Sequence, residues 1–412
     1  MSSDPNYYAA LPSLKELESA AWTPLEGKIP GINGHIHSPY SFSAFHNIEQ
    51  PFQMAKEEGI SVLGINDFYS TDGYGEFAAL AKQFRIFPLF NIEFMALQKA
   101  EQQSGIRIND PVNPGRTYMS GKGLCYPVRL SDQSLQKLEI LQQESNRQTY
   151  RMVDKLNDYL ASLNTGIRFD AADIQRRLAR NLLRERHIAA AVRLAVSEKY
   201  KTPEEIMKGF TLIFKGKTPK SSLENVASLE NEIRNNLLKS GGPAYVPEDE
   251  KAFLSLSEVT VFILDAGGIP CYPVLLDDAK GNFTEFEKEW SKMADRLTEL
   301  GIYMIELIPG RNDYSILKEF VHYFDKRGFP VTFGSEHNTP QLDPLTITCR
   351  GGALPDAGLQ RINYRGVSVI AAHQYLTANG ETGFPAGHFP SRSEKEKLEH
   401  LGMKIISEFT QA

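Results

Sequence analysis

Short apolar runs that alternate with helical patterns constrain the fold of this chain more than any other feature. In the first part of the chain the expected order is a strand at 31–37, a helix at 48–58, a strand at 61–65, a helix at 74–84 and a strand at 86–93. The alternation returns later as a strand at 269–272, a helix at 284–300, a strand at 302–307, a helix at 315–327 and a strand at 330–334. This order predicts an α/β protein whose parallel sheet is covered by helices.

The stretch between these two halves has a different character. Residues 100–126 contain the turn residues Asn113-Pro114-Gly115 and are expected to be loop-rich. Helical patterns then follow one another without a strand, at 130–163, 171–178, 182–199, 203–210 and 221–238. Thr202 is a typical N-cap, with proline at the first helical position after it. We therefore expect a helical insertion between the two halves, and a last amphipathic helix at about 392–409.

Size and composition bound the class of protein. The chain has 412 residues, of which 41% are hydrophobic and 23% are charged, as in ordinary soluble domains. The net charge of −6 argues against a broad nucleic-acid footprint, which would be basic. The cysteines Cys125, Cys271 and Cys349 are few and far apart, which favours a reducing, cytoplasmic setting. No stretch approaches the roughly 20 apolar residues that span a bilayer, so we expect no membrane association.

Two histidines one residue apart are the first candidate for chemistry. On a strand, His35 and His37 point to the same face because the strand period is two. Asp67 and Glu93 also fall at expected strand ends, where ligands gather in parallel α/β sheets. The pattern favours a metal site, although an isolated His-x-His is a weak signal that also fits one solvated and one buried histidine.

These motifs, in this order, resemble those of the polymerase and histidinol phosphatase (PHP) family. The family's first three motifs have their counterparts in His35-Ile36-His37, in Asn66-Asp67-Phe68 and in Phe90-Asn91-Ile92-Glu93. Later counterparts are Arg186-His187-Ile188-Ala189, Tyr245-Val246-Pro247, Cys271-Tyr272-Pro273 and Gly334-Ser335-Glu336-His337. The Arg186 segment is similar to the Arg-Pro-His-Ile-Ala element of the subgroup that carries a helical insert.

The resemblance implies a distorted, TIM-like (β/α)7 barrel with a helical insertion. The boundaries expected on this basis are an N-terminal extension at 1–28, a first barrel segment at 29–127, the insertion at 128–245, a second barrel segment at 246–390 and a C-terminal helix at 391–412.

The chain departs from the family at three metal-ligand positions. Phe42 stands where an aspartate is expected, and Phe68 and Tyr272 stand where histidines are expected. The family commonly holds two or three ions, so the resemblance here implies a reduced set. The remaining ligands are His35, His37, Glu93 and, less directly, Glu336, and they predict one divalent ion, either Zn²⁺, Mn²⁺ or Fe²⁺.

Two further residues are candidates for catalysis. Asp67 is expected to orient a metal-bound histidine or to act as a general base, with a loop-stabilising cap as the alternative. His337 is expected to act in catalysis or to supplement Glu336, with a buried structural histidine as the alternative. For Glu93, the alternative is a structural ion pair with Arg85 or Arg116.

Basic residues near the strand ends and in the insertion are candidates for holding an anionic substrate, because arginine forks suit phosphate. The candidates are Arg116, Arg184, His187 and Arg311. In the insertion, the alternative is a solvated helix face.

These features favour a metal-dependent hydrolase that acts on a small phosphorylated metabolite through a metal-activated water. The first alternative is a one-metal lyase, isomerase or amide hydrolase, since the fold does not determine the reaction. The second is a non-catalytic binding protein in which the three aromatic residues fill former metal positions.

Overall fold

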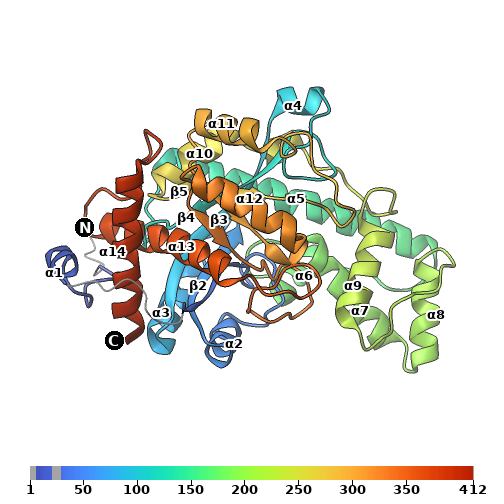
Figure 1. The fold of residues 1–412 in the computed structure, drawn as a ribbon. Helices are drawn as coiled ribbons and strands as arrows, with labels where there is room; N and C mark the ends of the chain where they lie inside the picture. The colour runs from blue at the N-terminus through green and yellow to red at the C-terminus, as the bar shows by residue number, and fades with distance from the viewer. Residues whose placement is uncertain (1–5, 21–28, 412) are drawn as a thin grey trace.

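The computed structural model describes residues 6–20 and 29–411, and at its centre seven strands form a nearly closed barrel (Figure 1). The strands follow one another in sequence order. They are β1 (Gly31–Ile36), β2 (Ile60–Phe68), β3 (Phe87–Leu97), β4 (Arg116–Lys122), β5 (Ile269–Val274), β6 (Met304–Leu307) and β7 (Val331–Phe333). Just beyond β7, the amides of Ser335 and Glu336 donate to the carbonyl of His35, which closes the sheet. The predicted TIM-like barrel with extra helices is confirmed.

The sheet is not wholly parallel. β4 runs antiparallel to both of its neighbours, whereas the other adjacent strands are parallel. The expectation of a loop over 100–126 was therefore wrong, since this stretch contains β4 and the short helix α4 (Lys99–Gln103). Ser120 and Lys122 of β4 are completely buried, so the strand carries polar residues where sequence patterns look for apolar ones.

Most of the expected helices are present at or near their predicted bounds. Those around the barrel are α2 (Gln50–Glu58), α3 (Tyr74–Phe84), α10 (Leu256–Asp265), α11 (Trp290–Glu299), α12 (Tyr314–Lys326) and α14 (Arg392–Gln411). The sequence did not predict α13 (Ala357–Ala378), which packs on β7 and α14. Its side chains are buried almost continuously from Ile362 to Leu376, so it lacks the amphipathic period that identifies a surface helix.

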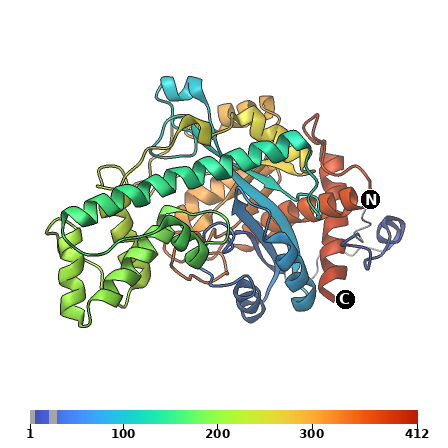
Figure 2. The same ribbon diagram turned by 180° about the vertical axis from the view of Figure 1, so that it is seen from behind.

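The helical insertion has its own hydrophobic core. α5 (Asp132–Ser162) begins against the barrel, where Leu138 and Leu141 join the main core. It then continues into a lateral lobe, where Met152 and Leu156 belong to a second core (Figure 2). The lobe is completed by α6 (Ala171–Leu178), α7 (Glu185–Lys199), α8 (Pro203–Ile213), α9 (Val226–Ile233) and a π-helical turn at Arg234–Leu238. One long helix thus connects the barrel to the lobe.

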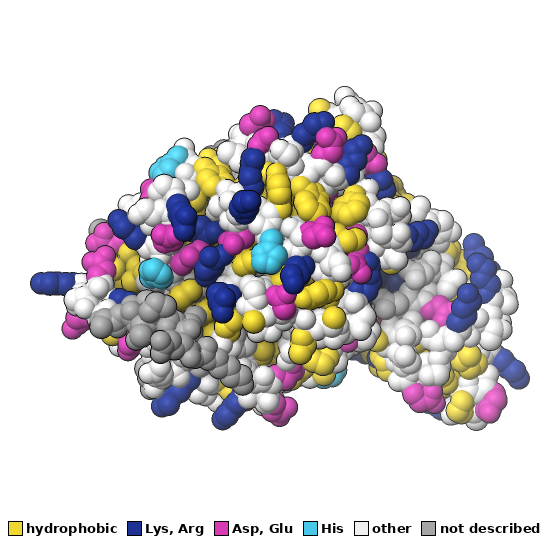
Figure 3. Space-filling model, viewed as in Figure 1, with side chains coloured by type: hydrophobic (Ala, Val, Ile, Leu, Met, Phe, Trp, Pro, Cys, Tyr) yellow, Lys and Arg dark blue, Asp and Glu magenta, His cyan; other side chains and the backbone are white. Residues whose placement is uncertain are grey.

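Of the N-terminal extension expected at 1–28, residues 6–20 lie within the described part and include α1 (Leu14–Ser19). Tyr7 and Tyr8 are buried in the barrel core. Among the described helices, none has both the length and the apolar character of a membrane span. On the face seen in Figure 3, basic and acidic side chains are interspersed.

Candidate metal centre

The barrel encloses polar side chains on the inner face of several strands. His35 lies on β1 and is 1% exposed, and a Cβ on Gly334 would lie only 2.2 Å from the Cβ of His35. Position 334 therefore needs glycine, because any larger residue would push β7 away from the strand that carries His35. The closure of the barrel and the position of His35 depend on the same contact.

His35, His37 and Glu93 bring three ligand atoms together. The Nε2 atoms of the two histidines are 3.3 Å apart, and Nε2 of His37 is 3.3 Å from Oε2 of Glu93. Two ligands of a tetrahedral ion with bonds of about 2.1 Å lie about 3.4 Å apart, so both distances suit a shared cation. Among the described residues, this is the one group of three or more His, Cys, Asp or Glu side chains with ligand atoms this close. The donor set fits one divalent ion.

The other ring nitrogen of His35, Nδ1, contacts a buried carboxylate. Nδ1 of His35 lies 3.0 Å from Oε2 of Glu306, on β6, and both residues are buried. Because a carboxylate accepts hydrogen bonds, Nδ1 carries the proton and the lone pair of Nε2 faces the cluster. This carboxylate–histidine arrangement is the one that orients metal-bound imidazoles in known sites.

Ser41 and Asp67 hold the ring of His37 in the same way. The hydroxyl of Ser41 donates to Oδ1 of Asp67 at 2.7 Å and lies 3.1 Å from Nδ1 of His37. Since the serine proton goes to Asp67, its oxygen accepts the Nδ1 proton of His37. Ser38 also donates to Asp67, from both its amide and its hydroxyl. Asp67 is completely buried and is linked to His37 through Ser41, and its role as a group that orients this histidine stays a prediction.

A buried ammonium group balances the charge behind the cluster. Nζ of Lys122 lies 2.5 Å from Oε2 of Glu306 and 3.1 Å from Oδ1 of Asn66. Burial alone would raise the pKa of Glu306, but the charge of Lys122 and the hydrogen bond from His35 outweigh it and hold that pKa well below its ordinary value. Glu306 and Glu93 together carry two negative charges against the single charge of Lys122. This excess favours a cation at the cluster.

Glu336 and His337 lie beside the cluster. The carboxylate of Glu336 forms an ion pair with Arg311 and accepts a hydrogen bond from Asn338, and it is not among the three ligand residues that converge. Both ring nitrogens of His337 are occupied, Nδ1 by the hydroxyl of Ser335 at 2.7 Å and Nε2 by the carbonyl of Asp343 at 2.8 Å. Its ring stacks on Phe45, 4.9 Å between centroids. Glu336 as a fourth metal ligand and His337 as a catalytic group therefore stay predictions.

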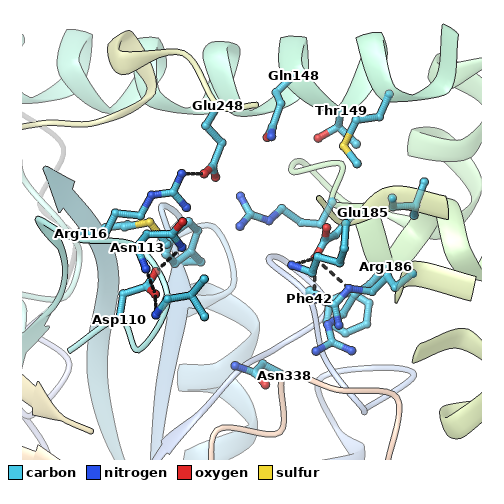
Figure 4. A pocket seen from close by; sticks show the side chains of 18 of the residues that line it. Phe42, Asp110, Asn113, Arg116, Gln148, Thr149, Glu185, Arg186, Glu248 and Asn338 are labelled. Atoms are coloured by element: carbon cyan, nitrogen blue, oxygen red, sulfur yellow. Dashed lines mark hydrogen bonds and ion pairs between the residues drawn. The ribbon is translucent and has the colours of Figure 1, made fainter. Parts of the chain in front are cut away.

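A cavity of about 560 Å³ opens over the cluster, between the barrel and the helical insertion. His37 and Glu93 line its floor, and Arg116 and Arg184 line its walls. Figure 4 shows the ion pair of Arg116 with Glu248 across the cavity from Phe42 and Arg186. Arg311 and His187 are not among the lining residues, and Nδ1 of His187 accepts a hydrogen bond from the amide of Arg184. Arg116 and Arg184, which line the cavity, are therefore better placed to contact a ligand there than Arg311 and His187 are.

The three aromatic residues that the resemblance implied at ligand positions have two different environments. Phe42 and Phe68 line the cavity beside His37 and Glu93. Tyr272 is buried elsewhere, and its hydroxyl donates to Glu287 at 2.9 Å. Only the two phenylalanines are thus in a position to influence a ligand.

Sequence reasoning missed Glu306, Lys122 and Ser41 as parts of the site. Ser41 stands in the first histidine motif, four residues after His37, and this proximity is a signal that was present but unused. Glu306 lies within an apolar strand in Ile305-Glu306-Leu307, where a single charged residue in a buried strand indicates a partner. Lys122 lies in the stretch expected to be loop, so its burial was unforeseen.

Metal binding at this cluster should depend on pH through His37. Burial disfavours the protonated ring, but the hydrogen bond and charge of Glu93 outweigh it and raise the pKa of His37 above its ordinary value of 6.5. Because a proton and a metal ion compete for Nε2, the apparent Zn²⁺ affinity should rise about tenfold per pH unit until that raised pKa is passed. Calorimetry in two buffers of different ionisation enthalpy should read about one proton released near pH 6. An affinity that does not change between pH 6 and 8 would contradict this.

Comparison with known proteins gave results only at the level of structure. No family model matches the chain, and no curated protein sequence matches it. A solved structure from Bifidobacterium adolescentis, provisionally assigned as a metal-dependent phosphoesterase, is similar with a TM-score of 0.52 and 16% identity, over 82% of this chain and 96% of that one. An amidohydrolase from Chromobacterium violaceum has a TM-score of 0.47 and 16% identity, over 78% of this chain and 93% of that one. At this identity, the likeness to the Bifidobacterium protein shows a shared fold.

Proposed function

We propose that this protein is a PHP-type, metal-dependent hydrolase that removes phosphate from a small phosphorylated metabolite and uses one divalent ion. The observation that supports this best is the cluster of His35, His37 and Glu93, with 3.3 Å between successive ligand atoms, on the floor of a cavity whose walls carry arginines. The cavity volume of about 560 Å³ suits a small molecule rather than a polymer. The three free cysteines favour a reducing, cytoplasmic setting for this activity.

The residues around the cluster and the cavity have different roles in this proposal. His35, His37 and Glu93 would hold the divalent ion, which when bound would lower the pKa of a water and polarise a phosphoryl oxygen. Glu306 and Ser41 hold the rings of His35 and His37 so that both Nε2 atoms face the cluster. The two histidines would therefore need to move little to bind an ion. Arg184 lines the cavity without a carboxylate partner among the described residues and would hold the anionic group of the substrate, whereas Arg116 is paired with Glu248 and would have to exchange that partner for the substrate. Phe42 and Phe68 narrow the water-accessible space beside His37.

The proposal is tested with the full chain, purified, stripped of metal and reloaded with Zn²⁺, Mn²⁺ or Fe²⁺ under anaerobic conditions. A panel of sugar and nucleoside monophosphates is assayed for free phosphate. We expect release for at least one substrate that depends on added metal and is lost in Glu93→Gln. Phosphate release no faster with metal than without, over the whole panel, would overturn the proposal.

A one-ion amide hydrolase is the second candidate, and one observation favours it. In the described part of the chain only one cluster has ligand atoms this close, whereas two-ion sites stabilise both the attacking and leaving oxygens in phosphate transfer. Carbonyl chemistry proceeds with one ion. Metal-dependent release of ammonia or an amine from amide substrates, without phosphate release, would identify this alternative.

A further inference from the structure

Two arginines at the start of α7 reach the cavity without a carboxylate partner. Arg184 and Arg186 both line it, and neither forms an ion pair with any described residue. Arg184 donates from Nη1 to the hydroxyl of Ser145 at 2.9 Å, and Arg186 donates from Nη1 to Oδ1 of Asn231 at 3.0 Å. Each guanidinium thus has one neutral partner and N–H groups left for a ligand, since arginine carries five.

Each of these guanidinium groups also lies over the face of a phenylalanine ring. Cζ of Arg184 is 4.7 Å from the ring centroid of Phe68, and Cζ of Arg186 is 5.2 Å from that of Phe42. Both distances are within the range of cation–π attraction, which is stronger when the pair is partly removed from water. The rings therefore fix the two charges beside the metal cluster.

The sequence positions of these two phenylalanines are important for interpreting the arginine–ring contacts. Phe42 and Phe68 stand at positions where the resemblance to the PHP family implied an aspartate and a histidine that bind metal. A phenyl ring cannot ligate an ion, but it can hold a guanidinium group against its face. At both positions, the positive charge next to the cluster is now supplied by an arginine of the helical insertion.

The other cations of the cavity lining named here each have a carboxylate partner. Arg116 is 2.5 Å from Glu248, and Arg234 and Lys239 share the carboxylate of Glu185. Burial, and then the charge of Arg234, lowers the pKa of Arg186 to about 10, although the charges of Glu185, Glu230 and Glu336 act in the opposite direction. Arg186 therefore remains charged at neutral pH. Among the described residues, Arg184 and Arg186 are thus the two cations of the cavity lining without a carboxylate at ion-pair distance.

We infer that Arg184 and Arg186, held on Phe68 and Phe42, form a phosphate clamp that takes over the charge of the missing metal ions. The clamp binds the phosphate dianion of the substrate even when the cluster holds no ion. Two guanidinium groups match the two negative charges of a phosphate monoester, and their planar forks match its oxygen atoms. This inference rests on the proposed function and deepens it by naming the group that is bound and the residues that bind it.

The test measures anion binding to the metal-free protein by titration calorimetry, with inorganic phosphate, phenyl phosphate and acetate as probes. We expect one site for both phosphates and at least tenfold weaker binding of acetate. Arg184→Gln and Arg186→Gln should each weaken phosphate binding at least tenfold. The matched control is Arg177→Gln, which removes an arginine of the same lobe whose side chain is 61% exposed, and it should bind phosphate as the wild type does.

Two further variants keep the test decisive if an arginine variant fails to fold. Phe42→Leu and Phe68→Leu preserve apolar packing and both arginines but remove the aromatic faces, and we expect each to weaken phosphate binding about threefold or more. Unchanged binding in the arginine variants, or in both leucine variants if the arginine variants do not fold, would overturn the inference. So would metal-free wild type that binds no phosphate, or acetate binding as tight as phosphate binding.

Metal binding separates the failure of this inference from that of the proposed function. Arg186→Gln should bind Zn²⁺ as the wild type does, whereas Glu93→Gln should lose Zn²⁺ and keep phosphate binding. Normal Zn²⁺ binding without phosphate binding would remove the clamp alone. Phosphate binding in a wild-type protein that never binds a divalent ion would leave the clamp in place and remove the metal-dependent hydrolase.

Discussion

A variant with both His35→Ala and His37→Ala is expected to lose stoichiometric divalent metal and about 10³-fold or more in turnover. Two of the three converging ligand atoms disappear, and a bound ion contributes several kcal/mol of transition-state stabilisation, at 1.36 kcal/mol per tenfold in rate. Elemental analysis of the purified protein gives the metal content, and the phosphate-release assay gives the rate.

The matched control for this variant is His46→Ala, because His46 is exposed and takes no part in the cluster. It should retain the metal and the turnover of the wild type. If the double variant keeps one equivalent of metal per chain, the cluster is not the metal centre.

Replacing Lys122 by methionine is expected to lower the free energy of unfolding by about 3–5 kcal/mol, because the change leaves the carboxylate of Glu306 buried without its ammonium partner. Methionine has nearly the same length and shape, so packing changes little. Equilibrium unfolding in urea, followed by circular dichroism, measures the change.

The double variant Lys122→Met, Glu306→Gln tests the cause of that loss. With both charges removed, no isolated charge is left in the barrel, so the double variant should be more stable than Lys122→Met alone. Lys99→Met is the surface control, since the Lys99–Glu250 pair is largely exposed and should contribute less than about 1 kcal/mol. A double variant no more stable than the single one would show that the Lys122–Glu306 charge pair does not account for the loss.

The local part of this architecture was predictable because its signals lie within short stretches of chain. The spacing of apolar residues indicates each strand and the helix that follows it. For example, α3 begins and ends at its predicted residues, Tyr74 and Phe84. The convergence of His35, His37 and Glu93 was also predictable. Two of them share a face by the strand period, and the third lies within β3, two strands away in the same sheet.

Sequence patterns failed to predict two elements in which the distribution of apolar and polar residues differs from that of an ordinary strand or surface helix. β4 turns Ser120 and Lys122 into the barrel, so a strand with polar inner residues was mistaken for loop. α13 is buried nearly all round and offered no amphipathic stripe. In both cases the side-chain pattern depends on neighbours that are distant in sequence.

The pattern of residues alone determined the helix-covered sheet, the helical insertion and the two histidines with their glutamate, since each follows from periodicity or from position along a strand. The closure of the sheet into a barrel was implied by the family resemblance. The charges that serve this cluster follow only from the three-dimensional packing. Glu306 lies 184 positions after its partner Lys122, and Arg184 meets Phe68 only because the insertion folds back over the barrel. Electrostatic partners need to be close in space and not in sequence, so no local pattern records them.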